Sequence, residues 1–255
     1  MGYLFGPGSM MWRINRESVL LLGGRAALLM QLAHPLVAAG VAEHSNFRNE
    51  PIRRLRRTLE VMLTIIFGTE EDARRVAASV NKVHDHVVGS APDGRAYRAR
   101  DPRLLMWVYA TLVDSSVKVF EACVEPLTPD ELATYYEESK VIARLFEIPE
   151  DHIPATHGDL KKWMRGMIDS GEVAVTPLAR ELAEPIIRPL RVVPRRLAAS
   201  ASVITAALLP SPIREGYGLR VSRPASALLA LGRRASRLLL PRVPAPVRSF
   251  PLVRP

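Results

Sequence analysis

Two arginines and a threonine in the run Arg54-Leu-Arg-Arg-Thr58 are the side chains in this sequence best placed to act together. Arg54, Arg57 and Thr58 have the spacing i, i+3, i+4, so on a helix they share one face. A second, apolar face lies roughly 110° around the same helix at about 100° per residue and consists of Leu55, Leu59, Met62 and Ile66. The pattern predicts a helix that packs its apolar side into a core and directs two guanidiniums and a hydroxyl at an anionic or oxygen-rich ligand. The alternative is an ordinary solvated basic face.

His84 is the candidate metal ligand, and His86 lies two residues beyond it. On a helix these two side chains diverge by roughly 200°, so we do not expect them to bind one metal ion together. A single neutral imidazole on a helix suits an axial haem ligand. The alternative is a core or surface histidine bonded to a backbone carbonyl.

A third candidate is the segment Gln31-Leu-Ala-His-Pro35. Pro35 interrupts a helix and leaves backbone groups without partners. His34 and Gln31 could therefore face a pocket. A buried histidine bonded to a nearby carbonyl is the alternative for His34.

The composition indicates an all-α fold. The chain has 255 residues, 48% of them hydrophobic and 6% aromatic, and a core rich in alanine and leucine favours helices over sheets. Helical periodicity runs almost throughout, and no strict alternation predicts a strand. We expect helices over 17–33, 35–43, 53–67, 69–88, 103–124, 128–146, 159–168, 176–188, 197–209 and 224–240, a polar loop over 90–101, and an extended or disordered end over 241–255.

Charge divides the chain into two parts. Residues 185–255 hold 13 arginines, no lysine and one acid, so this part carries +12; the whole chain carries +9, so residues 1–184 carry −3. Eleven of the 21 prolines also fall in 185–255. We therefore predict a helical domain over 1–184 and a basic Pro/Arg-rich extension over 185–255. The extension suggests contact with an anionic membrane surface, and the alternative is that its arginines pair with acids of the rest of the chain. Nucleic acid is not expected, because the extension lacks interleaved aromatic residues.

The segments above also occur in an order that is typical of one family. That order runs Arg16-Glu17, Gln31-Leu-Ala-His-Pro35, Val41-Ala-Glu-His-Ser45, Arg54-Leu-Arg-Arg-Thr58, Phe67-Gly-Thr69, His84 with Val87 and Gly89, Asp101-Pro102, Trp107 to Leu112, Tyr135-Tyr-Glu-Glu138 and Ile153-Pro-Ala-Thr156. Over roughly residues 12–170 it resembles the catalytic domain shared by MpaB-type oxygenases and rubber oxygenases, the latex-clearing proteins.

The resemblance implies a globin-like, all-helical haem domain that uses dioxygen. His84 matches the family's proximal ligand of haem b, and Arg54, Arg57 and Thr58 match its distal Arg-x-x-Lys-Thr motif. Arg57 replaces the lysine that can bind iron in the family. Because a guanidinium offers no usable lone pair, we expect Arg57 to position oxygen or a propionate instead. Arg54 and Thr58 are expected to stabilise charge that develops on dioxygen.

The leading hypothesis is thus a haem-dependent oxygenase that acts on a small lipophilic substrate, with an isoprenoid as one candidate. The alternative is a haem-free helical protein that binds lipid or another ligand at a membrane surface. The single cysteine, Cys123, excludes an intrachain disulfide and fits a reducing compartment. Gly23, Gly24 and Arg25 interrupt an early apolar run and argue against a secretion signal. We expect a cytoplasmic protein, peripheral at the inner membrane face; the sequence does not specify the oligomeric state.

Overall fold

The computed structural model describes residues 2–45, 51–187, 195–244 and 248–250. Over these residues the chain is helical apart from one two-stranded hairpin, which confirms the all-α class. The helices are α1 (Met10–Asn15), α2 (Leu21–Leu32), α3 (Pro35–His44), α4 (Pro51–Phe67), α5 (Glu70–Asp85), α6 (Pro102–Cys123), α7 (Pro129–Leu145), α8 (His157–Asp169), α9 (Pro177–Ile187), α10 (Arg195–Leu208), α11 (Ser211–Gly216) and α12 (Arg223–Leu239). Single 3-10 turns are η1 (Ser18–Leu20), η3 (Glu150–His152) and η4 (Leu240–Arg242).

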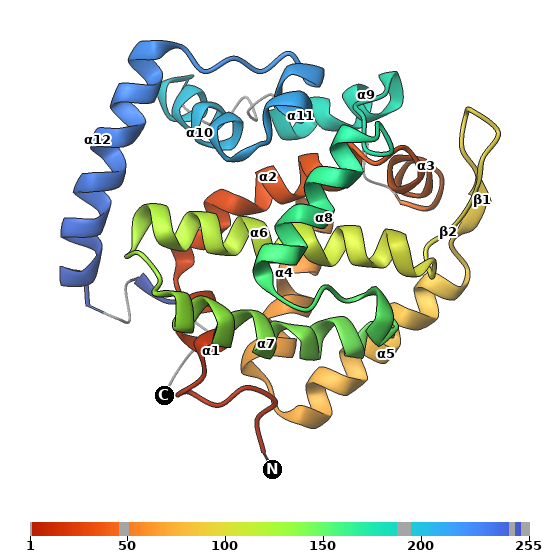
Figure 1. Ribbon diagram of the computed structural model, residues 1–255, viewed down its shortest axis with the longest axis horizontal. Helices are drawn as coiled ribbons and strands as arrows, with labels where there is room; N and C mark the ends of the chain where they lie inside the picture. Colours follow the sequence, from red (N-terminus) through yellow and green to blue (C-terminus); the bar gives the residue numbers. More distant parts are fainter. Residues whose placement is uncertain (1, 46–50, 188–194, 245–247, 251–255) are drawn as a thin grey trace.

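The long helix α6 is the centre of the molecule (Figure 1). It begins where the sequence predicts, because the Asp101 carboxylate caps it and Pro102 occupies its first turn. Helices α2, α7, α8 and α12 pack against it. Trp107, in its second turn, is fully buried and donates a hydrogen bond from Nε1 to the Met30 carbonyl of α2 at 3.0 Å. Helix α6 therefore joins layers from both halves of the sequence.

Close packing of α2 on α6 depends on one glycine. A Cβ added to Gly23 would lie 3.0 Å from a Val119 methyl and 3.2 Å from the Ser115 carbonyl oxygen. Its neighbour Gly24 has nothing within 4 Å of the same position. Gly23 is thus the residue that lets the two backbones approach each other.

The expectation that the chain has no strand is wrong. Residues Val88–Ser90 form β1 and Ala96–Arg98 form β2, which pair antiparallel inside the segment predicted as a polar loop. Three-residue strands are too short to show an alternating pattern. The turn between them does leave a signal, because Asp93-Gly94 is a preferred hairpin dipeptide and Gly94 adopts φ +84°.

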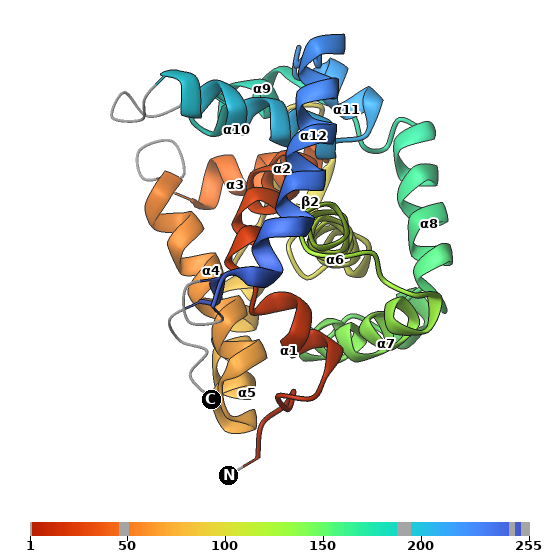
Figure 2. The same cartoon turned by 90° about the vertical axis from the view of Figure 1, so that its left-hand side faces the viewer.

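The C-terminal region packs onto the N-terminal helices. Helices α9, α10 and α11 lie together at one end of the molecule, and α12 descends along one side past α6 (Figures 1 and 2). Tyr217, which follows α11, donates a hydrogen bond to the Leu29 carbonyl of α2 at 2.9 Å. Within 241–255, where an extended or disordered end was expected, Ser249 forms a β-bridge with Glu17, and Phe250 is buried. One hydrophobic core thus includes residues from Phe5 to Phe250; the proposed division at residue 184 stays a prediction.

In the part of the chain that the structure describes, no single helix has the length and hydropathy needed to cross a membrane. The pair Ser18–Leu32 and Pro35–His44 has them only when joined, and it is bent by 101°. The bend falls at His34 and Pro35, where the sequence predicts the interruption.

Candidate functional site

Helices α4 and α5 carry the candidate residues and form a hairpin around Gly68 and Thr69. Thr69 is the N-cap of α5: its hydroxyl oxygen accepts a hydrogen bond from the Asp72 amide at 3.1 Å. Gly68 makes a turn in which any Cβ would lie 2.5 Å from the Thr64 carbonyl oxygen. Because so short a connection joins two helices that pack together, the beginning of α4 and the end of α5 lie toward the same end of the hairpin.

His84 lies near the end of α5, on the side of the helix that faces the rest of the protein. Ala73, Ala77 and Asn81 are buried on this side, and Val80 and His84 continue it half-buried. His86 follows as the C-cap of the helix and is exposed. The two histidines therefore differ in burial, as their predicted divergence on the helix requires.

Polar contacts hold the end of α5 against the end of α7 and against the segment that precedes α6. The Asn81 amide donates to the Leu145 carbonyl of α7 at 3.0 Å and to Glu147 Oε1 at 3.2 Å. Arg100 Nε lies 3.1 Å from Asp85 Oδ1, and the same guanidinium also pairs with Glu147. These contacts fix the last turn of α5 three residues before His84 and one residue after it, which favours a defined orientation of its imidazole.

On α4, burial changes along the helix. Ile66 is buried, whereas Leu59 and Met62 on the same predicted apolar face are only half-buried, and Arg57 and Thr58 are exposed. The side chains of Arg54 and Leu55 lie outside the described part of the structure. The first half of α4 thus offers donors and partly covered apolar side chains at the end of the hairpin that also holds His84.

A second polar group, formed by Glu43 and His44 of the quoted Val41–Ser45 segment with Tyr97, lies where the chain leaves α5. The Tyr97 hydroxyl donates a hydrogen bond to Glu43, and His44 Nε2 lies 3.1 Å from the Val88 carbonyl oxygen. Burial, and then the bond to Glu43, raises the pKa of Tyr97 to about 12, so the phenol keeps its proton. Gly89 allows this packing, since a Cβ there would lie 2.5 Å from both the Glu43 carboxylate and the Tyr97 hydroxyl oxygen. The group ties the end of α3 to the hairpin after His84; Gly89, within the quoted His84–Gly89 segment, is its signal in the sequence.

His34 and Gln31 lie at the other end of α3. His34 Nδ1 accepts the Leu36 amide at 3.3 Å and so caps the helix, while Gln31 donates to the Thr111 hydroxyl of α6 at 3.1 Å. Burial lowers the pKa of His34 to about 4. The imidazole is therefore neutral near pH 7, and its 3.9 Å contact with Glu172 is not an ion pair there. The contacts of these two residues are those of helix capping and interior packing.

No cluster of three or more His, Cys, Asp or Glu side chains that could hold a bare metal ion occurs among the described residues. A site with one protein ligand, such as the axial position of a haem, needs no such cluster.

Comparisons with known proteins identify the family of the chain. Uncharacterized protein Mb2261 of Mycobacterium bovis and uncharacterized protein Rv2237 of Mycobacterium tuberculosis are each 28% identical to it over 152 residues, which is 58% of this chain and 60% of each relative. The match therefore spans three fifths of the length of these curated relatives. No solved structure is significantly similar. The family model described as "ER-bound oxygenase mpaB/B'/Rubber oxygenase, catalytic domain" matches residues 11–239. The chain belongs to this family of oxygenase catalytic domains.

Proposed function

We propose that the protein is a haem b-dependent oxygenase that uses dioxygen on a small lipophilic substrate, with an isoprenoid as one candidate. Membership of the oxygenase family supports an oxidoreductase that uses dioxygen. The observation that carries the haem assignment is the position of His84, a half-buried imidazole at the end of α5.

The residues present fit a haem. The donor is one imidazole on a helix, and a single histidine of this kind would hold the haem iron. On α4, which packs against α5, the apolar cover is incomplete, because Leu59 and Met62 are half-buried while Ile66 is buried. A flat apolar group would complete that cover, and Arg57 offers a permanent positive charge for a propionate. Leu59, Met62 and His84 would hold the group.

When bound, the haem would supply the redox chemistry that activates dioxygen. His84 would hold the group in one orientation, because Asn81 and Asp85 fix its helical turn. Arg57 and Thr58 are exposed donors on α4. They would donate hydrogen bonds where negative charge develops and remain protonated while doing so. We assign Arg54 the same donor role, because its spacing places it on the helical face that carries Arg57 and Thr58.

We also propose that helix α12 brings the protein to an anionic membrane surface, from which a lipophilic substrate would be supplied. Leu231, Leu238 and Leu239 are 64%, 62% and 62% exposed. Their spacing of i, i+7, i+8 places them on one side of the helix. Arg234 lies beside this side and is also exposed. Exposed leucines with arginine next to them are typical of helices that lie in a membrane interface.

The haem assignment is tested by the pair His84→Ala and His86→Ala. We expect His84→Ala to fold but to purify without haem, and His86→Ala to keep the Soret absorption of the wild type. Circular dichroism would show that both variants are folded. An unchanged Soret band in both variants would contradict the ligand assignment. A wild-type protein that stays colourless after reconstitution with haem, yet binds lipid vesicles, would favour the haem-free alternative.

The distal role is tested by a second matched pair, Arg54→Gln and Arg56→Gln. Arg56 belongs to another face of α4, where its Nε donates to Glu60 at 2.7 Å. We expect Arg54→Gln to keep haem but to lose dioxygen consumption on the order of 100-fold with an isoprenoid alkene, as for the loss of one preorganised donor. Arg56→Gln should consume dioxygen at the wild-type rate. Equal rates in the two variants would exclude a distal role for Arg54.

A further inference from the structure

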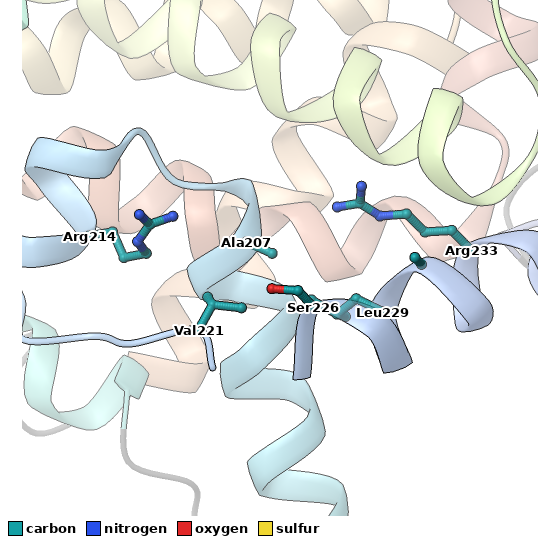
Figure 3. Close-up of a pocket in the computed structure, with 7 residues that line it drawn as sticks. Ala207, Arg214, Val221, Ser226, Leu229 and Arg233 are labelled. Carbon is teal, nitrogen blue, oxygen red and sulfur yellow. The ribbon is translucent and has the colours of Figure 1, made fainter. Parts of the chain in front are cut away.

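A cleft of about 350 Å³ lies between α10, α11 and α12 (Figure 3). Helices α10 and α11 are at the other end of the molecule from the α4–α5 junction (Figure 1). Two guanidiniums and a hydroxyl face the cleft, from Arg214, Arg233 and Ser226. Figure 3 shows the Arg233 side chain extending toward the part of the cleft where Arg214 lies, with the Ser226 hydroxyl between them. The remaining lining residues are small or apolar: Ala207, Val221, Leu229 and Ala230.

Neither arginine has an acidic partner among the residues that the structure describes. Arg214 is half-buried and donates to the Ser211 hydroxyl at 3.0 Å, and Arg233 is exposed. Within the described residues, no carboxylate lies within ion-pairing distance of either guanidinium, although many arginines elsewhere are paired, Arg103 with Glu172 for example. The cleft is therefore positively charged and has donors available for an added anion.

One face of helix α12 lines the cleft. Ser226, Leu229, Ala230 and Arg233 have the spacing i, i+3, i+4, i+7 and so share one face, which is opposite to the exposed leucines.

One turn further on, two side chains anchor α12 to α6. The Ser236 hydroxyl donates to the Cys123 carbonyl at 2.8 Å, and Arg237 Nε donates to the Glu121 carbonyl at 2.9 Å. The position of Arg233 over the cleft is thus set by contacts within the protein.

We propose that this cleft binds a phosphate group, with Arg214 and Arg233 on either side of it and Ser226 donating a hydrogen bond. A guanidinium binds phosphate oxygens through two parallel N–H groups, which is stronger and more directional than a single ammonium contact. A volume of about 350 Å³ is at the small end of ligand sites and suits a phosphate with a small substituent. A lipid headgroup and a free phosphate share this chemistry.

The test compares Arg214→Gln and Arg233→Gln with the control Arg220→Gln. Arg220 is exposed in the segment between α11 and α12 and does not line the cleft, so the control removes the same charge from the same region. Binding of inorganic phosphate is measured by calorimetry at constant ionic strength. Binding to vesicles of equal parts phosphatidylcholine and phosphatidic acid is measured by sedimentation. We expect each cleft variant to weaken phosphate binding about tenfold or more, and the control less than about twofold.

The two binding measurements distinguish a free phosphate from a lipid headgroup. If inorganic phosphate binds and the cleft variants lose it, the ligand is a free phosphate; if only vesicles bind and the cleft variants lose more than the control, it is a headgroup. Both results support the site. Equal losses in all three variants, or no binding of either probe by the wild type, would overturn it. If Arg214→Gln fails to fold, Arg233→Gln and Ser226→Ala, both at exposed positions, carry the same comparison, and Arg214→Lys tests whether charge alone suffices.

Discussion

At the scale of single residues, burial separates the histidines of this chain into groups with different chemistry. His34 is 1% exposed and neutral, His84 is half-buried, and His86 and His152 are exposed. The spacing of His84 and His86 predicts their divergence, because helix geometry is local. The capping role of His34 is also local, but its partner is the Leu36 amide and not the backbone carbonyl that a buried histidine would suggest. The contact of His34 with Glu172 spans more than a hundred residues and leaves no pattern in the sequence.

The stability of the protein should fall as the pH drops from about 6.5 to about 4, in part because of His34. Burial lowers the pKa of His34 to about 4, against about 6.5 in an unfolded chain. In that window the unfolded chain takes up a proton that the folded protein does not, so acid favours unfolding. The contribution reaches about 3 kcal/mol below pH 4. Urea unfolding of His34→Asn, which keeps an acceptor for the Leu36 amide, should show a flatter dependence on pH.

The matched control for this prediction is His152→Gln, at an exposed position. It should keep the wild-type dependence on pH. Glu172 remains in both variants, and its pKa is lowered mainly by its bond to Arg103; it weakens the fold in acid in all three proteins. Identical slopes in wild type and His34→Asn would show that His34 is not the group responsible.

At the scale of elements, caps and prolines mark the helices, and this is why their positions are predictable. Thr69 and Thr128 cap α5 and α7, and Pro35 and Pro102 lie in the first turns of α3 and α6. These signals are local and strong. The β1–β2 hairpin is not predictable in the same way, because its strands are too short to show a pattern and Tyr97 packs against α3, which is distant in the sequence.

Replacement of glycine by alanine should lower the free energy of unfolding at Gly68 and raise it at Gly24. In Gly68→Ala the new methyl would lie 2.5 Å from the Thr64 carbonyl oxygen, so the α4–α5 junction must shift, at a cost of about 1–3 kcal/mol. In Gly24→Ala the methyl meets nothing within 4 Å inside α2, and alanine stabilises a helix by about 0.5–1 kcal/mol relative to glycine. Chemical denaturation of both variants measures the sign of each change in the free energy of unfolding. A destabilised Gly24→Ala or an unaffected Gly68→Ala would contradict the packing described.

The exposed leucines of α12 give a further prediction at this scale. Leu231→Ser with Leu238→Ser removes two exposed apolar side chains and should leave the free energy of unfolding within about 0.5 kcal/mol of the wild type. Sedimentation with anionic vesicles should nevertheless fall, because less apolar area enters the interface. Val83→Ser, at a 51% exposed position on α5, is the control and should bind vesicles like the wild type. Unchanged sedimentation of the leucine variant would exclude α12 as the membrane contact.

At the scale of the whole molecule, contact between the two parts neutralises some of their unequal charge. Among the described arginines of 185–255, Arg248 pairs with a carboxylate: its Nε lies 3.4 Å from Glu17 Oε1. Arg237 instead donates to a backbone carbonyl. Composition alone predicts the charge difference, but it does not predict which arginine reaches the buried Glu17, because that contact depends on the complete path of the chain.

The far end of the described chain should contribute measurably to the stability of the whole. Phe250 is buried, its amide donates to the Arg16 carbonyl at 3.1 Å, and Ser18 donates to the Arg248 carbonyl at 2.7 Å. Phe250→Ala should lower the free energy of unfolding by about 2–3 kcal/mol. This loss is at or below the usual range for a core phenylalanine, because residues 248–250 can undock and so limit it. Since Phe250 shares one core with Phe5 and Trp107, the variant should still unfold in a single transition, with tryptophan fluorescence and far-ultraviolet circular dichroism changing together. Leu239→Ala, at a 62% exposed position, should change stability by less than about 0.5 kcal/mol. A Phe250→Ala variant as stable as the wild type would mean that the C-terminal residues do not dock in solution, and two separate transitions would mean that the C-terminal region folds independently of the helices before it.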